Sequence, residues 1–263
     1  MNELIALLLG IIQGLTEFLP VSSSGHLELA KALTSAENIS EKSLLFTIVL
    51  HAATALSTLV VFRKDIGDIL KDLLSFKPNQ SFYFSLYIVI SMIPAALVGL
   101  FLEDLINSLF NQNILLVGTM LILTGGLLFL ADRAKASAKS ITASSATIIG
   151  LLQAVAILPG ISRSGATIAT AVLLGIDKEK AARFSFLMVI PLIFGSMAKS
   201  ILDADNLIIN DSLSPLLIGF VTAFITGIIA CKWMIAIVKK AQLSYFSYYC
   251  FIVGLTAIVI SLL

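Results

Sequence analysis

Charged side chains are what this chain has least of. Only 13% of its 263 residues are Asp, Glu, Lys or Arg, whereas a soluble domain carries about 25%. Hydrophobic residues make up 58% of the chain, and no stretch is polar enough to form a water-soluble domain. We therefore predict a single membrane domain over 1–263, with the bilayer as its solvent.

Other scarcities exclude further classes of protein. The net charge is +1, so no basic field indicates a nucleic-acid partner. The two cysteines, Cys231 and Cys250, lie in apolar runs without the spacing of a metal or redox pair. Near the N-terminus, Glu3 stands where a secretory signal carries positive charge, and no cleavage site follows. We expect this segment to stay in the mature protein.

Six apolar stretches are long enough to cross a bilayer, which takes about 20 residues. They lie near 43–62, 82–103, 112–131, 184–202, 213–237 and 245–263. Two further segments, 3–29 and 143–175, are interrupted midway by LPVSSSGH (19–26) and LPGISRSG (158–165). Irregular backbone at membrane depth persists only where protein or a wet cavity satisfies it. Both segments are therefore predicted to be re-entrant helix–break–helix hairpins.

The charges of the connecting loops predict the orientation of these hairpins. Lys and Arg occur in loops 63–81, 132–142, 176–183 and 238–244 and are absent from loops 104–111 and 203–212. The positive-inside rule makes the first four cytoplasmic and the last two external. Successive loops can alternate between the two sides of the membrane only if segment 143–175 begins and ends inside. Segment 3–29 must then begin and end outside. The two hairpins are thus predicted to have opposite orientations.

The sequence also repeats itself after 140 residues. The shift places Gly10 on Gly150, Gln13 on Gln153, Ser22 on Ser162, Ser24 on Ser164, Gly25 on Gly165 and Phe46 on Phe186. Inverted repeats whose broken helices meet near the midplane are a known membrane architecture. We predict an all-α polytopic fold of six transmembrane helices plus two re-entrant hairpins, with repeats over about 1–133 and about 141–263. The two breaks would lie face to face.

Ionisable residues in the apolar parts of the hairpins are few: Glu17, His26 and Arg163. Each costs about 2.5–3.5 kcal/mol to insert into a membrane and is usually functional. Any one alone could be structural, as a neutral acid, a core imidazole or half of an ion pair. Because all three gather with five serines at two helix breaks, they indicate a site.

The residue types at the second break suit a phosphate ligand. Arg163 offers a planar fork of donors that matches phosphate oxygens, and a helix that starts there presents free amides to an anion. The other residues predicted to surround the anion are Gly160, Ser162, Ser164 and Gly165, with Ser22 and Ser24 from the mirrored break.

Ser23 and His26 are predicted to be a nucleophile and its general base. They are three residues apart at a helix start, where such residues share a face. Direct attack by His26 or by water stays open. Ser22 is the rival nucleophile, but its counterpart Ser162 has no base beside it, which suggests that both cap the following helix.

Gln13 and Glu17, four residues apart, also share a helix face. Their oxygens suit a hard divalent cation that would also touch phosphate. The alternative is that Glu17 only orients His26 or Arg163.

At these residues the sequence resembles the BacA/UppP family of undecaprenyl-diphosphate phosphatases. QGLTEFLPVSSSGH (13–26) and PGISRSG (159–165) match the two family motifs in order. The likeness covers nearly the whole chain, including FTIVLHAATALSTLVVFRKDI (46–66). The family's functional positions fall on Gln13, Glu17, Ser23, Ser24, His26, Ser162 and Arg163. Gln13 is Glu in some members, which leaves Glu17 as the main charge.

The resemblance implies hydrolysis of undecaprenyl diphosphate to the monophosphate, which recycles the lipid carrier for cell-wall synthesis. It also implies a divalent cation, Mg²⁺ or Ca²⁺, and competition by bacitracin, which binds the substrate. The expected location is the bacterial plasma (inner) membrane, with several passes and a cleft facing outward. The oligomeric state stays open, a homodimer included.

Three other functions compete with this interpretation. Lipid phosphatases of the acid-phosphatase type also use Ser-Gly-His and Ser-Arg, but this chain lacks their later His and upstream Lys…Arg-Pro. A lipid-phosphate transporter or flippase is the main alternative, because inverted repeats and broken helices are transporter features. Such a protein would leave the Ser–His pair idle, although both activities can coexist. A channel is disfavoured because the polar residues cluster and line no path.

Overall fold

The protein is all-helical wherever its chain can be described. The computed structural model describes residues 2–33, 40–75, 79–109, 113–135, 137–203, 213–239 and 242–262. The first half contains α1 (Glu3–Phe18), α2 (Ser23–Leu33), α3 (Ser40–Val61), α4 (Arg63–Leu73), α5 (Gln80–Phe101), α6 (Glu103–Leu109) and α7 (Ile114–Asp132). The second half contains α8 (Ala143–Val155), α9 (Arg163–Leu173), α10 (Lys178–Asp203), α11 (Leu213–Lys239) and α12 (Ser244–Leu262). These helices confirm the predicted all-α class.

Five helices are long and apolar enough to cross a membrane: α5, α7, α10, α11 and α12. The sixth predicted span, 43–62, qualifies only together with α4, from which it is bent by 77°. The structure therefore supports five or six spans, consistent with a multi-pass membrane protein.

Two predicted loops contain short helices. Helix α6 begins one residue before the expected loop 104–111 and covers most of it, and α4 lies within the expected loop 63–81. Helix α4 is amphipathic, since Ile66 and Ile69 pack against the core while Lys64 is exposed. Charged residues in a loop therefore did not exclude a helix, because α4 rests one apolar edge on the core.

The basic connections gather at one end of the bundle. Asp132 at the end of α7 accepts a hydrogen bond from the amide of Leu243 at 3.0 Å and lies 3.6 Å from Lys178 Nζ. Asp65 on α4 pairs with Arg183 on α10 at 2.6 Å. Parts of all four segments predicted to be cytoplasmic thus lie together.

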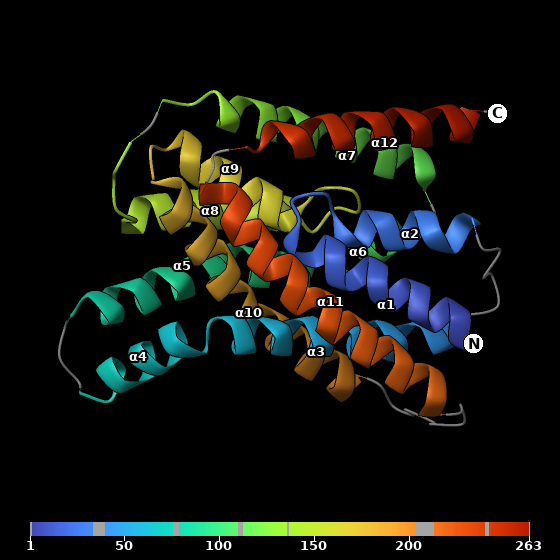
Figure 1. Cartoon of the computed structure of the whole chain (residues 1–263), viewed down its shortest axis with the longest axis horizontal. Coiled ribbons are helices and arrows are strands. Elements are labelled where there is room, and N and C mark those ends of the chain that lie inside the picture. The colour runs from blue at the N-terminus through green and yellow to red at the C-terminus, as the bar shows by residue number, and fades with distance from the viewer. Residues whose placement is uncertain are drawn as a thin grey trace.

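The opposite end holds both termini (Figure 1). There the Ser214 hydroxyl at the start of α11 donates to the Glu3 carboxylate at the start of α1. Most of the predicted external loop 203–212 lies outside the described residues. The placement of both termini away from the basic end agrees with the alternation predicted from loop charges.

The two broken hairpins meet in the middle of the molecule. Helices α1 and α2 come from the end that holds the termini, and α8 and α9 come from the basic end (Figure 1). Their breaks touch, because the Ser164 hydroxyl donates to the Leu19 carbonyl at 3.3 Å and Arg163 pairs with Glu17. The predicted face-to-face arrangement of the breaks is confirmed.

Helix partners are exchanged between the two halves. Helix α1 packs against α11 and α8 packs against α5, while α7 and α12 pack against each other. A glycine permits each close crossing. A Cβ on Gly10 would lie 2.0 Å from Thr222 Oγ1, and one on Gly150 would lie 2.5 Å from the Ser91 carbonyl oxygen. Small residues at such crossings let helices approach closely in membranes.

Aromatic packing fixes the end of α1 beside the site. The Phe186 ring on α10 lies 6.0 Å from the Phe18 ring and 6.0 Å from the Phe62 ring. Phe18 and Phe186 are almost fully buried. Because Phe18 follows Glu17 directly, this cluster holds the position of the Glu17 carboxylate.

Candidate active site

Each break ends in a serine that caps the next helix. The Ser162 hydroxyl accepts a hydrogen bond from the amide of Gly165 at 3.0 Å, and the Ser22 hydroxyl accepts from the amide of Gly25 at 3.2 Å. This is the bond by which a side chain satisfies the first turn of a helix. The predicted capping role of both serines is confirmed, and it directs both helix starts toward the meeting point.

The backbone at the breaks is unusual at two positions. Ser22 has a φ of 70°, a region that few non-glycine residues adopt. Gly160 has a φ of 97°, and a Cβ there would lie 2.5 Å from the Val117 carbonyl oxygen. Only glycine fits at position 160 without displacing its neighbours.

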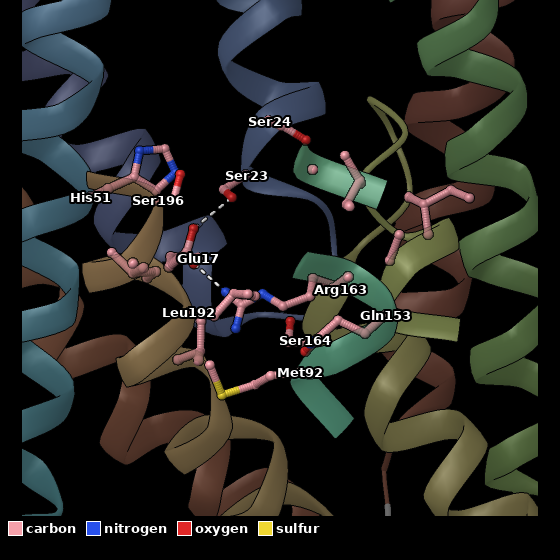
Figure 2. Close-up of a pocket in the computed structure, with 18 of the residues that line it drawn as sticks. Glu17, Ser23, Ser24, His51, Met92, Gln153, Arg163, Ser164, Leu192 and Ser196 are labelled. Carbon is pink, nitrogen blue, oxygen red and sulfur yellow. Dashed lines mark hydrogen bonds and ion pairs between the residues drawn. The ribbon is translucent and has the colours of Figure 1, made fainter. Parts of the chain in front are cut away.

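Glu17 is the centre of the polar cluster. Its Oε2 accepts a hydrogen bond from the Ser23 hydroxyl at 2.7 Å, and its Oε1 pairs with Arg163 (Figure 2). The same Oε2 accepts a second hydrogen bond from the Gln13 amide at 3.0 Å. Gln13 and Glu17 are buried. Three other predicted site residues, Gln13, Ser23 and Arg163, therefore surround the Glu17 carboxylate.

Glu17, Ser23 and Arg163 of this cluster line a cavity of about 560 Å³, a size typical of small-molecule sites. Five serines also line it: Ser22, Ser23, Ser24, Ser162 and Ser164. The rest of the wall is mainly apolar and includes Met92, Ala95, Leu100, Ile106, Leu192 and Ile193. Gly160 and Gly165 are not among the described lining residues and act by shaping the backbone. The cavity thus suits a molecule with an anionic head and an apolar chain.

His26 is placed differently from the prediction. Its Nδ1 lies 2.8 Å from the Ser22 carbonyl oxygen, and its Nε2 lies 2.8 Å from the Tyr249 hydroxyl. The two rings stack with centroids 5.6 Å apart. His26 is not among the described residues that line the cavity.

The expected pairing of Ser23 with His26 is therefore wrong as geometry. Ser23 is the first residue of α2, and its hydroxyl reaches back across the break to Glu17. His26 turns away to the carbonyl four residues before it.

Two buried glutamine oxygens are relevant as possible ligands of the expected cation. Gln13 Oε1 and Gln153 Oε1 are buried and have no hydrogen-bond partner in the described part of the chain. The described residues contain no group of three or more His, Cys, Asp or Glu side chains that could hold a metal. Gln13 Oε1 and Glu17 nevertheless fit a hard cation that takes its other ligands from phosphate oxygens and water, as Mg²⁺ usually does.

Five polar lining residues were not predicted: Thr16, His51, Gln153, Ser196 and Lys199. Figure 2 shows His51 and Ser196 on one side of Glu17 and Gln153 on the other. Ionisable residues inside membrane segments are costly and usually functional. Applying this rule to the predicted span 43–62, and not only to the hairpins, would have identified His51 as a candidate. Gln153 could have been found as the repeat counterpart of Gln13.

Known proteins resemble this chain over nearly its whole length. The model of the family described as bacitracin resistance protein BacA matches residues 6–256. A protein of Christiangramia forsetii named undecaprenyl-diphosphatase is 59% identical over 254 residues, which are 97% of this chain and 96% of the relative. A protein of the same name from Bacteroides fragilis is 49% identical, with 97% of each chain covered.

The likeness also reaches archaeal proteins. A protein of Methanococcus vannielii, again named undecaprenyl-diphosphatase, is 40% identical over 256 residues, with 96% of this chain and 98% of the relative covered. The family match over residues 6–256 spans all the residues of the candidate site. The chain belongs to the BacA family.

Proposed function

We propose that this protein hydrolyses undecaprenyl diphosphate to undecaprenyl phosphate and inorganic phosphate. The observation that carries the proposal is the Glu17 carboxylate between the Ser23 hydroxyl and the Arg163 guanidinium. These groups line a cavity whose remaining wall is mainly apolar. Family membership and the names of the relatives support the same substrate.

Arg163 and the helix starts bind the diphosphate. The guanidinium presents two parallel donors to phosphate oxygens. The first turns of α2 and α9 add backbone amides that have no partner within their own helix. Ser24 and Ser164, each two residues after a capping serine, supply further hydroxyl groups at the cavity wall. Binding is therefore spread over both breaks.

Ser23 attacks the terminal phosphorus, and Glu17 takes its proton. The hydrogen bond of 2.7 Å already points the hydroxyl hydrogen at the carboxylate. The new bond joins Ser23 Oγ to phosphorus as the bridging P–O bond breaks, so undecaprenyl phosphate leaves. Water then hydrolyses the phosphoserine, Ser23 recovers its proton, and inorganic phosphate is released. Catalysis rests on positioning and charge neutralisation, as in phosphoryl transfer generally.

Gln13 and Glu17 would hold a divalent cation, Mg²⁺ or Ca²⁺, together with substrate oxygens. The bound cation would neutralise part of the charge of the diphosphate. Gln13 positions Glu17 through its amide, and its unpartnered Oε1 supplies the second protein oxygen. The prenyl chain would lie along the apolar wall formed by α5 and α10 and leave the cavity toward the lipid.

The chain forms one membrane domain of two repeats, about 1–133 and about 141–263, in the bacterial inner membrane. The cleft opens outward, the termini are external, and a homodimer is compatible with this arrangement. Single-cysteine labelling of sealed cells, on a background without Cys231 and Cys250, should modify position 107 or 206 and spare 135 or 239. Labelling at 135 would contradict the orientation.

The activity is tested with purified protein and undecaprenyl diphosphate in detergent. We expect phosphate release that requires a divalent cation and that bacitracin suppresses by sequestering the substrate. The competing function, a lipid-phosphate transporter or flippase, is tested in vesicles with a labelled prenyl phosphate. Transport without any phosphate release by folded protein would replace the phosphatase with the transporter.

A further inference from the structure

His51, on α3, has a ring nitrogen available to the cavity. Its Nδ1 lies 2.9 Å from the carbonyl oxygen of Thr47. Because a carbonyl oxygen only accepts hydrogen bonds, Nδ1 carries the proton, and Nε2 of the neutral ring bears a lone pair. Nε2 makes no hydrogen bond within the part of the chain that the structure describes.

The other histidine offers no such lone pair. His26 donates from Nδ1 to the Ser22 carbonyl, so its neutral Nε2 accepts the hydroxyl hydrogen of Tyr249. Both of its ring nitrogens are therefore engaged. Of the two histidines, only His51 combines a place in the cavity wall with a ring nitrogen that has no hydrogen-bond partner in the described part of the chain.

His51 also lines the same cavity as the proposed reacting groups. Figure 2 shows its ring beside Ser196 of α10, with the Glu17 carboxylate and Ser23 next to it. Gly195 and Ser196 line the cavity and are exposed. The ionisable groups that line the cavity with His51 are Glu17, Arg163 and Lys199. His51 thus faces the cavity that also holds the Ser23 hydroxyl.

We infer that His51 is the general base of the second half-reaction, the hydrolysis of phosphoserine 23. This inference rests on the proposed function. His51 Nε2 takes a proton from the attacking water as its oxygen bonds to phosphorus. The bond from phosphorus to Ser23 Oγ breaks, and the serine oxygen recovers the proton that Glu17 took in the first step. His51 then gives its proton to solvent. Two bases thus serve the two steps, one for the serine and one for the water.

The test is acid-quench trapping with a long-chain prenyl diphosphate labelled in its terminal phosphate. For His51→Ala we expect steady-state turnover to fall about 10²–10⁴-fold, the usual contribution of a general base. Labelled phosphate should accumulate on Ser23 to nearly one per protein, with a matching burst of prenyl monophosphate. Formation of this phosphoserine also shows that the variant is folded. The control is Leu56→Ala, which removes an exposed side chain of the same helix and should behave as the unaltered protein.

Two results would overturn the inference. The first is slow turnover of His51→Ala without trapped phosphate, while the unaltered protein turns over normally. The second is full turnover of His51→Gln, because glutamine can hold a water but cannot take its proton. Failure of the proposed function looks different, since the unaltered protein would then release no phosphate at all.

Discussion

The two hairpins are built alike but carry different chemistry. Residues that are identical after the shift of 140, such as Ser22 and Ser162, cap helices and shape the backbone. The proposed reacting groups stand where the halves differ. Glu17 corresponds to Ile157, Ser23 to Arg163 and His51 to Pro191, and all six residues line the cavity. A symmetric frame thus presents one carboxylate, one hydroxyl, one guanidinium and one imidazole to a single substrate.

The largest effect should follow from replacing Ser23, the residue of the first repeat that corresponds to Arg163 in the second. Ser23→Ala removes the attacking oxygen, and we expect kcat to fall by about 10⁴-fold or more, with no phosphoenzyme after acid quench. His26→Ala is assayed beside it and should retain phosphoserine. A phosphorylated His26 in the Ser23→Ala protein would assign the attack to the imidazole. Substantial turnover without phosphoenzyme in either variant would assign it to water.

Replacing Arg163, the counterpart of Ser23 in the second repeat, should have the next largest effect. Arg163→Lys keeps the positive charge but loses the bidentate fork, so we expect kcat/KM to fall about 10²–10³-fold. The measurement is steady-state phosphate release by protein whose thermal unfolding is unchanged. Nearly normal kcat/KM in this variant would show that Arg163 does not hold the diphosphate.

The matched glycines of the frame should affect stability in both halves. Gly10→Ala and Gly150→Ala force a methyl group into crossings where a Cβ lies 2.0 Å and 2.5 Å from its nearest neighbour. Overpacking of this kind costs about 1–3 kcal/mol, which should lower Tm in detergent for both variants. Gly126→Ala is the control, because nothing lies within 4 Å of a Cβ there. A loss of stability in only one half would break the equivalence of the two crossings.

The smallest effect should be a difference between Gln13 and Gln153 in how their replacement changes the Mg²⁺ dependence of turnover. Gln13 donates to Glu17, whereas Gln153 lies 3.4 Å from the Ser91 carbonyl. Gln13→Glu adds an anionic ligand beside Glu17, so we expect the Mg²⁺ concentration for half-maximal turnover to fall about threefold to tenfold. Gln153→Glu is the matched control and should leave this concentration unchanged. Equal shifts in both variants would place the cation elsewhere.

Much of the fold was predictable because it follows from composition along the chain. Pro, Gly, Ser and a charge inside apolar stretches predicted both hairpins, and the basic loops predicted which end each one enters. The bend of 77° between α3 and α4 was not predictable. It depends on how Ile66 and Ile69 pack against the core, which the local sequence does not specify.

The site was predictable in its members but not in its pairings. The spacing of three residues correctly suggested that Ser23 and His26 are neighbours on a helix. It could not show that Ser23 reaches back over the break to Glu17, or that His26 finds Tyr249, 223 positions away. Helical periodicity describes contacts within one helix, and these contacts are made across a break and between distant helices.

The ion pair between Glu17 and Arg163 also determines the electrical balance of the site. With both groups ionised, their charges cancel, which limits the cost of burying them in a medium of low dielectric constant. A diphosphate that takes over Arg163 leaves the Glu17 carboxylate and its own negative charges to be compensated. The proposed divalent cation, bound together with the diphosphate, would supply that compensation. We therefore expect the protein to bind the diphosphate lipid only together with a cation. The site would then stay nearly neutral, and the lipid without a cation would be excluded.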